Sequence, residues 1–208
     1  YNRSASFDRI YRGGMPNIET SLSNYIADFS NGYAPNELGI TPDYNPYWDY
    51  EVNADWLSIL AYNSCIINPI GFSSDYDGLY KFDNQGYPIT AGDAMFSVRE
   101  QGYVDEYSIN IGGNFVDMVY WGIGLGIADL EYNKYAYYDE ELATPRSDAS
   151  EIVDIDCFSV DNYKHVSGTG YNLKAGLIVK PINELRLGLA VHTPTYYDLR
   201  YDYDAIGY

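Results

Sequence analysis

Four segments in the second half of the chain alternate apolar residues with small or polar residues, and this period of two constrains the fold more than any other feature. In 106–112, tyrosine and isoleucine occupy the odd positions, and polar residues or glycine occupy the even ones. The same alternation recurs in 118–128, 171–180 and 185–192. Because the side chains of a β-strand point alternately to its two faces, each segment predicts a strand with one apolar face. The sequence therefore predicts a mainly β, antiparallel protein.

The connections between these strands differ in length. Residues 113–117 and 181–184 are short enough for tight turns, whereas the acidic, Tyr-rich segment 131–155 predicts a long loop. Short turns at one end and long loops at the other are typical of outer-membrane barrels. Each apolar face covers about nine residues, enough for a tilted strand to cross the apolar layer of a membrane. We interpret the segments as strands of a transmembrane β-barrel, with a soluble sandwich or barrel as the alternative.

Residues 11–92 lack this alternation and contain most of the prolines. Spacings of three and four between apolar residues predict two short helices, at 18–29 and 54–67, the second with Asn53 as its N-cap. A small hairpin is expected around 83–86, where Asp and Asn favour Asx turns over a calcium loop. A connection of this length with structure of its own is usually functional.

Composition excludes several classes of protein. The chain has 12 basic and 30 acidic residues among 208, a formal charge of −18, which argues against a nucleic-acid partner. The 25 tyrosines argue against disorder, and where they cluster at strand ends they fit the aromatic girdles of membrane proteins. No apolar run is long enough for a transmembrane helix. Cys65 and Cys157 form no metal-binding spacing, and they are either a disulfide or two free thiols.

The polar residues predict no catalytic site. His165 and His192 stand outside any nucleophile or metal motif, so we expect no enzymatic activity, metal or cofactor. His192 shares a strand face with Arg186 and, in a simple hairpin register, lies near Asn172 and Lys174. Such a lumen patch could attract a carboxylate head group through charge-assisted hydrogen bonds. Alternatively, these basic groups pair with acidic residues of a hatch or of neighbouring strands.

Two apolar features suggest contact with a ligand. The predicted helices of 11–92 carry residues that could form a hydrophobic capture groove, although apolar helical stripes also form small cores. The groove residues are Tyr25, Ile26, Phe29, Trp56, Leu57 and Leu60. The row Gly122, Gly124 and Gly126 indicates either close approach by a hatch, ligand or kinked neighbour, or relief of crowding inside a barrel.

Longer stretches of the strand region resemble a known family. They are 168–181, 185–196, and 106–114 with 121–126. Together they resemble the FadL-like outer-membrane transporters of long-chain fatty acids and aromatic hydrocarbons, and most closely the branch often labelled hemin receptors. The resemblance implies a 14-stranded monomeric barrel in outer-membrane lipid, plugged by an N-terminal hatch, with helical outer loops that first capture the ligand.

In this alignment, residues 1–10 are the end of a barrel strand, 11–92 are an extracellular loop, and 93–208 are about four successive strands. Because so few strands cannot close a membrane barrel, the chain is expected to be a piece of a larger domain. The resemblance implies passive uptake of hydrophobic small molecules such as long-chain fatty acids. The alternative is a surface-exposed binding or adhesion module that uses its Tyr-rich loops to recognise glycans or proteins.

Overall fold

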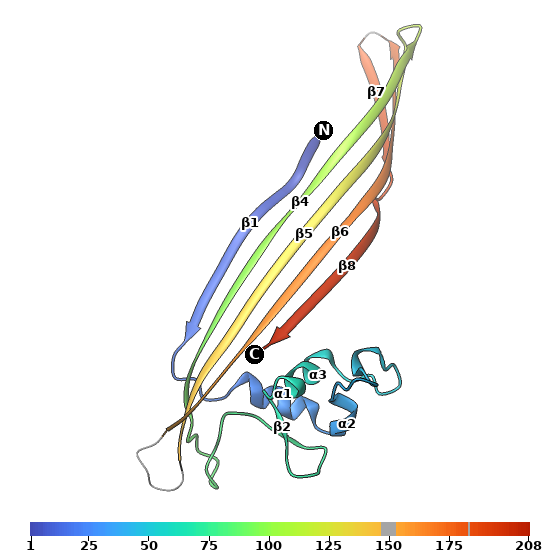
Figure 1. Cartoon of the computed structure of the whole chain (residues 1–208). Helices are drawn as coiled ribbons and strands as arrows, with labels where there is room; N and C mark the ends of the chain where they lie inside the picture. The colour runs from blue at the N-terminus through green and yellow to red at the C-terminus, as the bar shows by residue number, and fades with distance from the viewer. Residues whose placement is uncertain (147–152, 183) are drawn as a thin grey trace. The chain divides into compact units, whose positions relative to one another are not determined.

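The computed structural model describes residues 1–146, 153–182 and 184–208, and it is mainly β. Six strands form one sheet in the order β1, β4, β5, β6 and β7, with β8 also paired to β6 (Figure 1). They are β1 (Asn2–Met15), β4 (Ala91–Phe115), β5 (Val119–Pro145), β6 (Val153–Ile182), β7 (Leu185–His192) and β8 (Tyr196–Gly207). The sheet is antiparallel and strongly curled, as in half of a barrel. The predicted fold class is therefore confirmed at the level of a curled antiparallel sheet.

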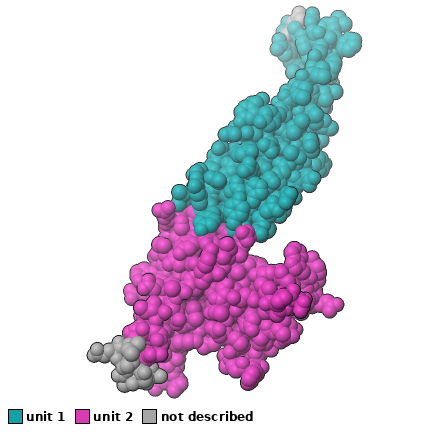
Figure 2. Space-filling view, viewed as in Figure 1, with its two compact units in different colours: residues 1–10, 99–135, 163–203 teal, residues 11–98, 136–162, 204–208 magenta. Residues whose placement is uncertain are grey.

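Between β1 and β4 the chain forms short helices and a two-stranded ribbon. They are α1 (Leu22–Ser30), α2 (Pro35–Leu38), the 3-10 helix η1 (Pro46–Trp48), α3 (Trp56–Asn63), β2 (Asn68–Pro69) and β3 (Tyr76–Asp77). The chain divides into two compact units (Figure 2). Unit 1 contains residues 1–10, 99–135 and 163–203, and unit 2 contains residues 11–98, 136–162 and 204–208.

The strands extend further than the sequence predicted. β5 continues to Pro145 and β6 begins at Val153, so most of the predicted loop at 131–155 is strand. Apolar alternation fades there because both faces carry Tyr, Asp, Glu and Lys, yet tyrosine favours extended backbone. Cross-strand polar contacts replace apolar ones; the Tyr132 hydroxyl, for example, donates to Glu100 Oε1 at 3.0 Å. A prediction based on hydrophobic alternation alone therefore ends these strands too early.

A short interruption separates β7 from β8. Pro194 has no N–H to donate to a neighbouring strand, which breaks the regular pairing. Beside it, the Leu173 amide donates to the side-chain oxygen of Thr193 at 3.0 Å. Lys174 pairs with His192, and Gly170 lies against Tyr197. Four residues on β6 therefore correspond to five on its partner. This extra residue reverses which side chains of the partner strand face each side of the sheet.

The helices of unit 2 bury a different face from the one predicted. In α1 the buried residues are Ser23, Ile26, Ala27 and Ser30, and in α3 they are Ser58, Ile59 and Ala61. Small side chains let the two helices approach closely, and Ser30 Oγ bonds Ser58 Oγ at 2.8 Å inside the contact. Leu142 of β5 and Phe158 of β6 complete this core. Of the apolar residues on the predicted faces, some are buried, such as Ile26 and Ala61, and others are exposed, such as Phe29.

Polar side chains fix where the helices and turns of unit 2 begin. Leu22 N–H, in the first turn of α1, donates to Glu140 Oε1 of β5 at 2.7 Å, so a strand carboxylate lies at the positive end of that helix. The N-cap of α3 is Asp55 and not the predicted Asn53, since Asp55 Oδ1 accepts from Leu57 N. The predicted Asx turn at Asp83 is confirmed by its bonds from Gln85 N and Tyr87 N.

Tyr76 makes the folding of unit 2 sensitive to alkaline pH. Its hydroxyl donates to the Tyr33 carbonyl at 3.0 Å, and burial, with smaller contributions from Tyr62 and Glu37, raises its pKa to about 12. The stabilising contribution of the protonated phenol is complete below the ordinary pKa of about 10 and is lost as the pH rises towards 12. Tyr76→Phe should reduce this alkaline transition, to which Tyr80 and Tyr138 also contribute because burial raises their pKa values, and should cost about 1 kcal/mol at neutral pH. Near-UV circular dichroism during alkaline titration measures both effects, and the exposed Tyr25→Phe is the control.

Candidate functional site

The sheet of unit 1 has one apolar face. Leu177 pairs with Leu189 and Ala175 pairs with Val191, so these side chains lie on the same side of β6 and β7. We call this side the apolar face. Its exposed aliphatic residues are Ile109, Ile111, Ile123, Leu125, Leu173, Leu177, Leu187, Leu189 and Val191, with exposed fractions from 39% at Leu125 to 68% at Leu189. Four adjacent strands therefore present a continuous apolar surface to their surroundings.

Aromatic residues occur at both ends of the apolar face. Tyr107 and Tyr171 precede its aliphatic residues on β4 and β6, and the ring of Tyr107 lies 5.4 Å from that of Tyr1. At the end near the short turns, the Trp121 ring covers Gly113, 3.3 Å from where a Cβ would be. The apolar face is thus bordered by amphipathic rings on two sides.

Beyond Tyr107 the same side of the sheet becomes polar. Arg3 donates to both carboxylate oxygens of Asp105, at 2.7 and 2.9 Å, and the Tyr103 hydroxyl donates to Glu131 at 3.0 Å. These bonds join β1 to β4 and β4 to β5. The apolar face therefore has a definite boundary, beyond which charges and hydroxyls replace aliphatic groups.

The opposite face of unit 1 carries an ion pair that spans three strands. Lys174 Nζ of β6 lies 2.5 Å from Glu106 Oε1 of β4, although β5 runs between those strands. The two side chains meet over Gly126. A Cβ at that position would lie 2.8 Å from Glu106 Oε1 and 2.5 Å from Asn172 Oδ1. The absence of a side chain at Gly126 is therefore what leaves room for the pair.

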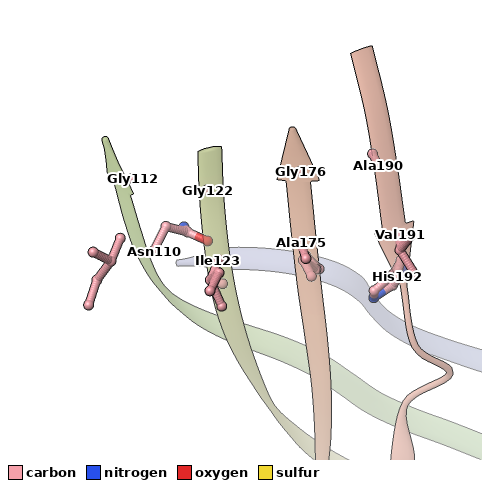
Figure 3. Close-up of a pocket in the computed structure, with 12 residues that line it drawn as sticks. Asn110, Gly112, Gly122, Ile123, Ala175, Gly176, Ala190, Val191 and His192 are labelled. Atoms are coloured by element: carbon pink, nitrogen blue, oxygen red, sulfur yellow. The ribbon is translucent and has the colours of Figure 1, made fainter. Parts of the chain in front are cut away.

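Next to this ion pair is an open groove of about 580 Å³. Its floor consists of small residues, Gly112, Gly122, Gly176 and Ala190, one from each of four strands. Its polar edge is formed by Asn110, Lys174 and His192. Figure 3 shows the Asn110 side chain extending from β4 toward β5, with the His192 side chain beside its own strand, β7.

A second hollow of about 510 Å³ shares part of the same floor. It adds Tyr120 and Ile178 to the shared residues Gly122, Gly176 and Ala190, and it lies toward the short turns. The linings also include neighbouring residues of the apolar face, among them Ile123 and Val191 in the first hollow and Leu177 and Leu189 in the second. By strand alternation, the small and polar residues of the two hollows lie on the face opposite the apolar face. We call the two hollows together the inner groove.

The structure brings together three residues of the predicted polar patch. Lys174 of β6 and His192 of β7 are directly paired, and Asn172 lies two residues from Lys174 on the same face of β6. Arg186 is on the same side of β7 by alternation but six residues from His192, outside the groove lining. Glu106 was not among the residues predicted for the patch. Its position on the polar side of 106–112 was visible, but the strand order that places it against Lys174 was not.

The glycine row has two roles. Gly124 and Gly126 lie beneath polar side chains, since Asn110 Oδ1 occupies the place of a Cβ at Gly124. Gly122 has only a backbone oxygen 3.8 Å from its Cβ position and lines the inner groove. Relief of crowding thus accounts for two of the three glycines, and the third leaves open space.

The six residues predicted to form a capture groove separate in unit 2. Ile26 is fully buried in the core, and Leu57 and Leu60 pack against it. Tyr25 and Phe29 are exposed on α1 with their rings stacked 6.5 Å apart. Trp56 is also exposed, at the start of α3. A compact core and an exposed aromatic pair therefore replace a single groove.

Within the described ranges, Cys65 and Cys157 are free thiols, and no group of three or more metal-ligating side chains gathers at one place. None of the helices in the described part of the chain is both long and apolar enough to span a membrane. Protein-family models give no match to this chain, and neither do curated proteins.

Proposed function

We propose that this chain forms part of an outer-membrane β-barrel channel, of the FadL-like type that its sequence resembles, through which hydrophobic small molecules enter passively. The observation that carries the proposal is the apolar face of unit 1. Soluble monomeric proteins rarely expose contiguous apolar patches of this kind. Outer-membrane barrels carry such a band on their lipid-facing side, between aromatic girdles, and a polar lining inside.

The other side of the same sheet fits a lumen. The inner groove combines small residues with a few polar groups, and such a lining allows binding that is weak enough for onward movement. Within the described chain, β1 at one border of the sheet and β7 and β8 at the other pair on one side only. Further strands of a closed barrel would pair with the free backbone groups of these border strands, since a membrane barrel has no open edge in lipid.

The helices of unit 2 supply a surface for first capture. Tyr25 and Phe29 offer two stacked rings to the surroundings, with 65% and 51% of each residue exposed. Aromatic rings bind apolar chains and flat hydrocarbons without requiring a charged partner. In this proposal the loop between β1 and β4 lies outside the membrane and takes up the ligand before it reaches the barrel.

Deletion of the parent gene tests the proposal directly. The protein should be recovered in the outer-membrane fraction, and deletion should reduce uptake of radiolabelled hexadecanoate or hexadecanol several-fold, because the channel lowers the barrier at the outer membrane. Uptake of a hydrophilic solute, measured in the same cells, should stay unchanged. Recovery in the soluble fraction, or uptake unaffected for both apolar probes, contradicts the proposal.

A binding or adhesion role is the second candidate, and the exposed aromatic side chains of unit 2 favour it. Trp48 and Tyr50 are 71% and 87% exposed, and such rings stack on sugar faces in many proteins that bind glycans. This role predicts that cells lacking the protein lose adhesion to glycan-coated surfaces while uptake of both apolar probes is normal.

A further inference from the structure

The positive charge at the polar edge of the inner groove is balanced by an acidic side chain of the same sheet. Lys174 is the one cation among the described residues that line its polar end, and Glu106 holds its ammonium group at 2.5 Å. The Glu106 side chain is 23% exposed and the Lys174 side chain 42% exposed, so the contact is partly shielded from water. The positive charge of Lys174 is therefore already balanced by a side chain of the same sheet.

The ion pair is held in place by its surroundings. Gly126 leaves the space in which Glu106 reaches across β5, and Asn172 borders the same space. Glu106 is attached to the neighbouring strand, so it competes with any entering anion at a high effective concentration. A carboxylate ligand would also lie close to Glu106, and two like charges at this distance repel each other.

The remaining hydrogen-bonding groups suit an uncharged partner. The Asn110 amide and the His192 imidazole can each donate or accept. Asn172 Oδ1 is buried and finds no donor among the described residues. Asn172 lies beside Gly126 and Glu106, outside the groove lining, so the Asn110 and His192 side chains are the uncharged polar groups that an entering molecule meets. A hydroxyl group can donate to the acceptor atoms of these side chains, whereas a carboxylate cannot.

We infer that the inner groove selects hydrophobic molecules whose polar end is uncharged, such as long-chain alcohols, over carboxylates of the same length. This inference rests on the proposed transport function and narrows its substrate class. It differs from the expectation, drawn from the sequence, that the polar patch attracts a carboxylate head group. The difference arises because Lys174 is already bound to an acidic side chain.

The test compares two probes of equal chain length, hexadecanol and hexadecanoate, in cells that produce the full-length parent protein. The assay is performed at about pH 8, where the fatty-acid carboxyl group is ionised. The wild type should transport the alcohol about tenfold faster, equivalent to about 1.4 kcal/mol of discrimination. Glu106→Gln should free Lys174 and shift the ratio toward hexadecanoate by a similar factor. Glu100→Gln is the matched control, because Glu100 is on the same strand but contacts Tyr132 and not Lys174.

The outcomes separate the two proposals. Equal transport of both probes by the wild type, or an unchanged ratio in Glu106→Gln, overturns the inference and leaves the transport function standing. Transport of neither probe overturns the transport function and the inference together. If Glu106→Gln fails to assemble because Lys174 is left unpaired, the double variant Glu106→Gln with Lys174→Gln replaces it. That variant should keep the preference for the alcohol, and a preference for hexadecanoate would contradict the inference.

Discussion

Leu189→Arg should prevent stable assembly of the parent protein in the outer membrane, whereas Ala190→Arg should allow it. Leu189 and Ala190 both border the second hollow, but their side chains alternate: that of Leu189 lies on the apolar face, with 68% of the residue exposed, and that of Ala190 lies on the opposite face. An arginine on the lipid-facing side of a membrane barrel costs about 2–4 kcal/mol near the midplane and much less on the lumen side. The two substitutions introduce the same side chain one residue apart, so their difference reports which face meets lipid.

Assembly is measured in outer-membrane fractions by the heat-dependent shift of folded barrels in gel electrophoresis, and stability by urea unfolding in lipid vesicles. Leu187→Ala serves as a second control, since it shortens a side chain on the apolar face without adding charge. Equal loss of assembly for both arginine variants would contradict the membrane proposal. It would instead favour a soluble sheet with both faces packed.

Leu189 was placed correctly from sequence because the alternation in 185–192 is uninterrupted. The same rule failed for β5 beyond residue 130, where Tyr and acidic residues occupy both faces and no apolar period remains. Strand existence could therefore be predicted where burial is one-sided. Strand length could not, because it depends on cross-strand bonds such as Tyr132 to Glu100.

The buried faces of the helices and the identity of the acidic partner of Lys174 could not be predicted, for different reasons. The contact between α1 and α3 selects small residues such as Ser30 and Ser58, and a count of apolar side chains gives these no weight. The pair of Glu106 with Lys174 joins residues far apart in sequence across an intervening strand. Locating it requires both the strand order and the register. Neither follows from local periodicity, since a one-residue slip reverses every face.

Gly168→Ala should detach β8 from β6, whereas Gly176→Ala should have little effect. Both glycines lie on β6 and both substitutions add the same methyl group. At Gly168 the new Cβ would overlap the backbone oxygen of Asp198 and lie 3.0 Å from the Cα of Leu199. At Gly176 the nearest atom is a backbone oxygen 3.9 Å away, an ordinary van der Waals contact. The first site can accommodate the methyl group only if the strands separate.

Backbone atoms cannot rotate away as a long side chain can. We therefore expect Gly168→Ala to lower the free energy of unfolding by about 1–3 kcal/mol, as overpacking of a core does. Amide hydrogen exchange of the full-length protein should show reduced protection in 196–203, with β4 and β5 unchanged. Gly176→Ala should match the wild type at every strand. Equal protection of β8 in both variants would mean that β8 does not depend on close approach to Gly168. The one-residue register change at Pro194 would then have to be fixed by the threonine side chains beside it.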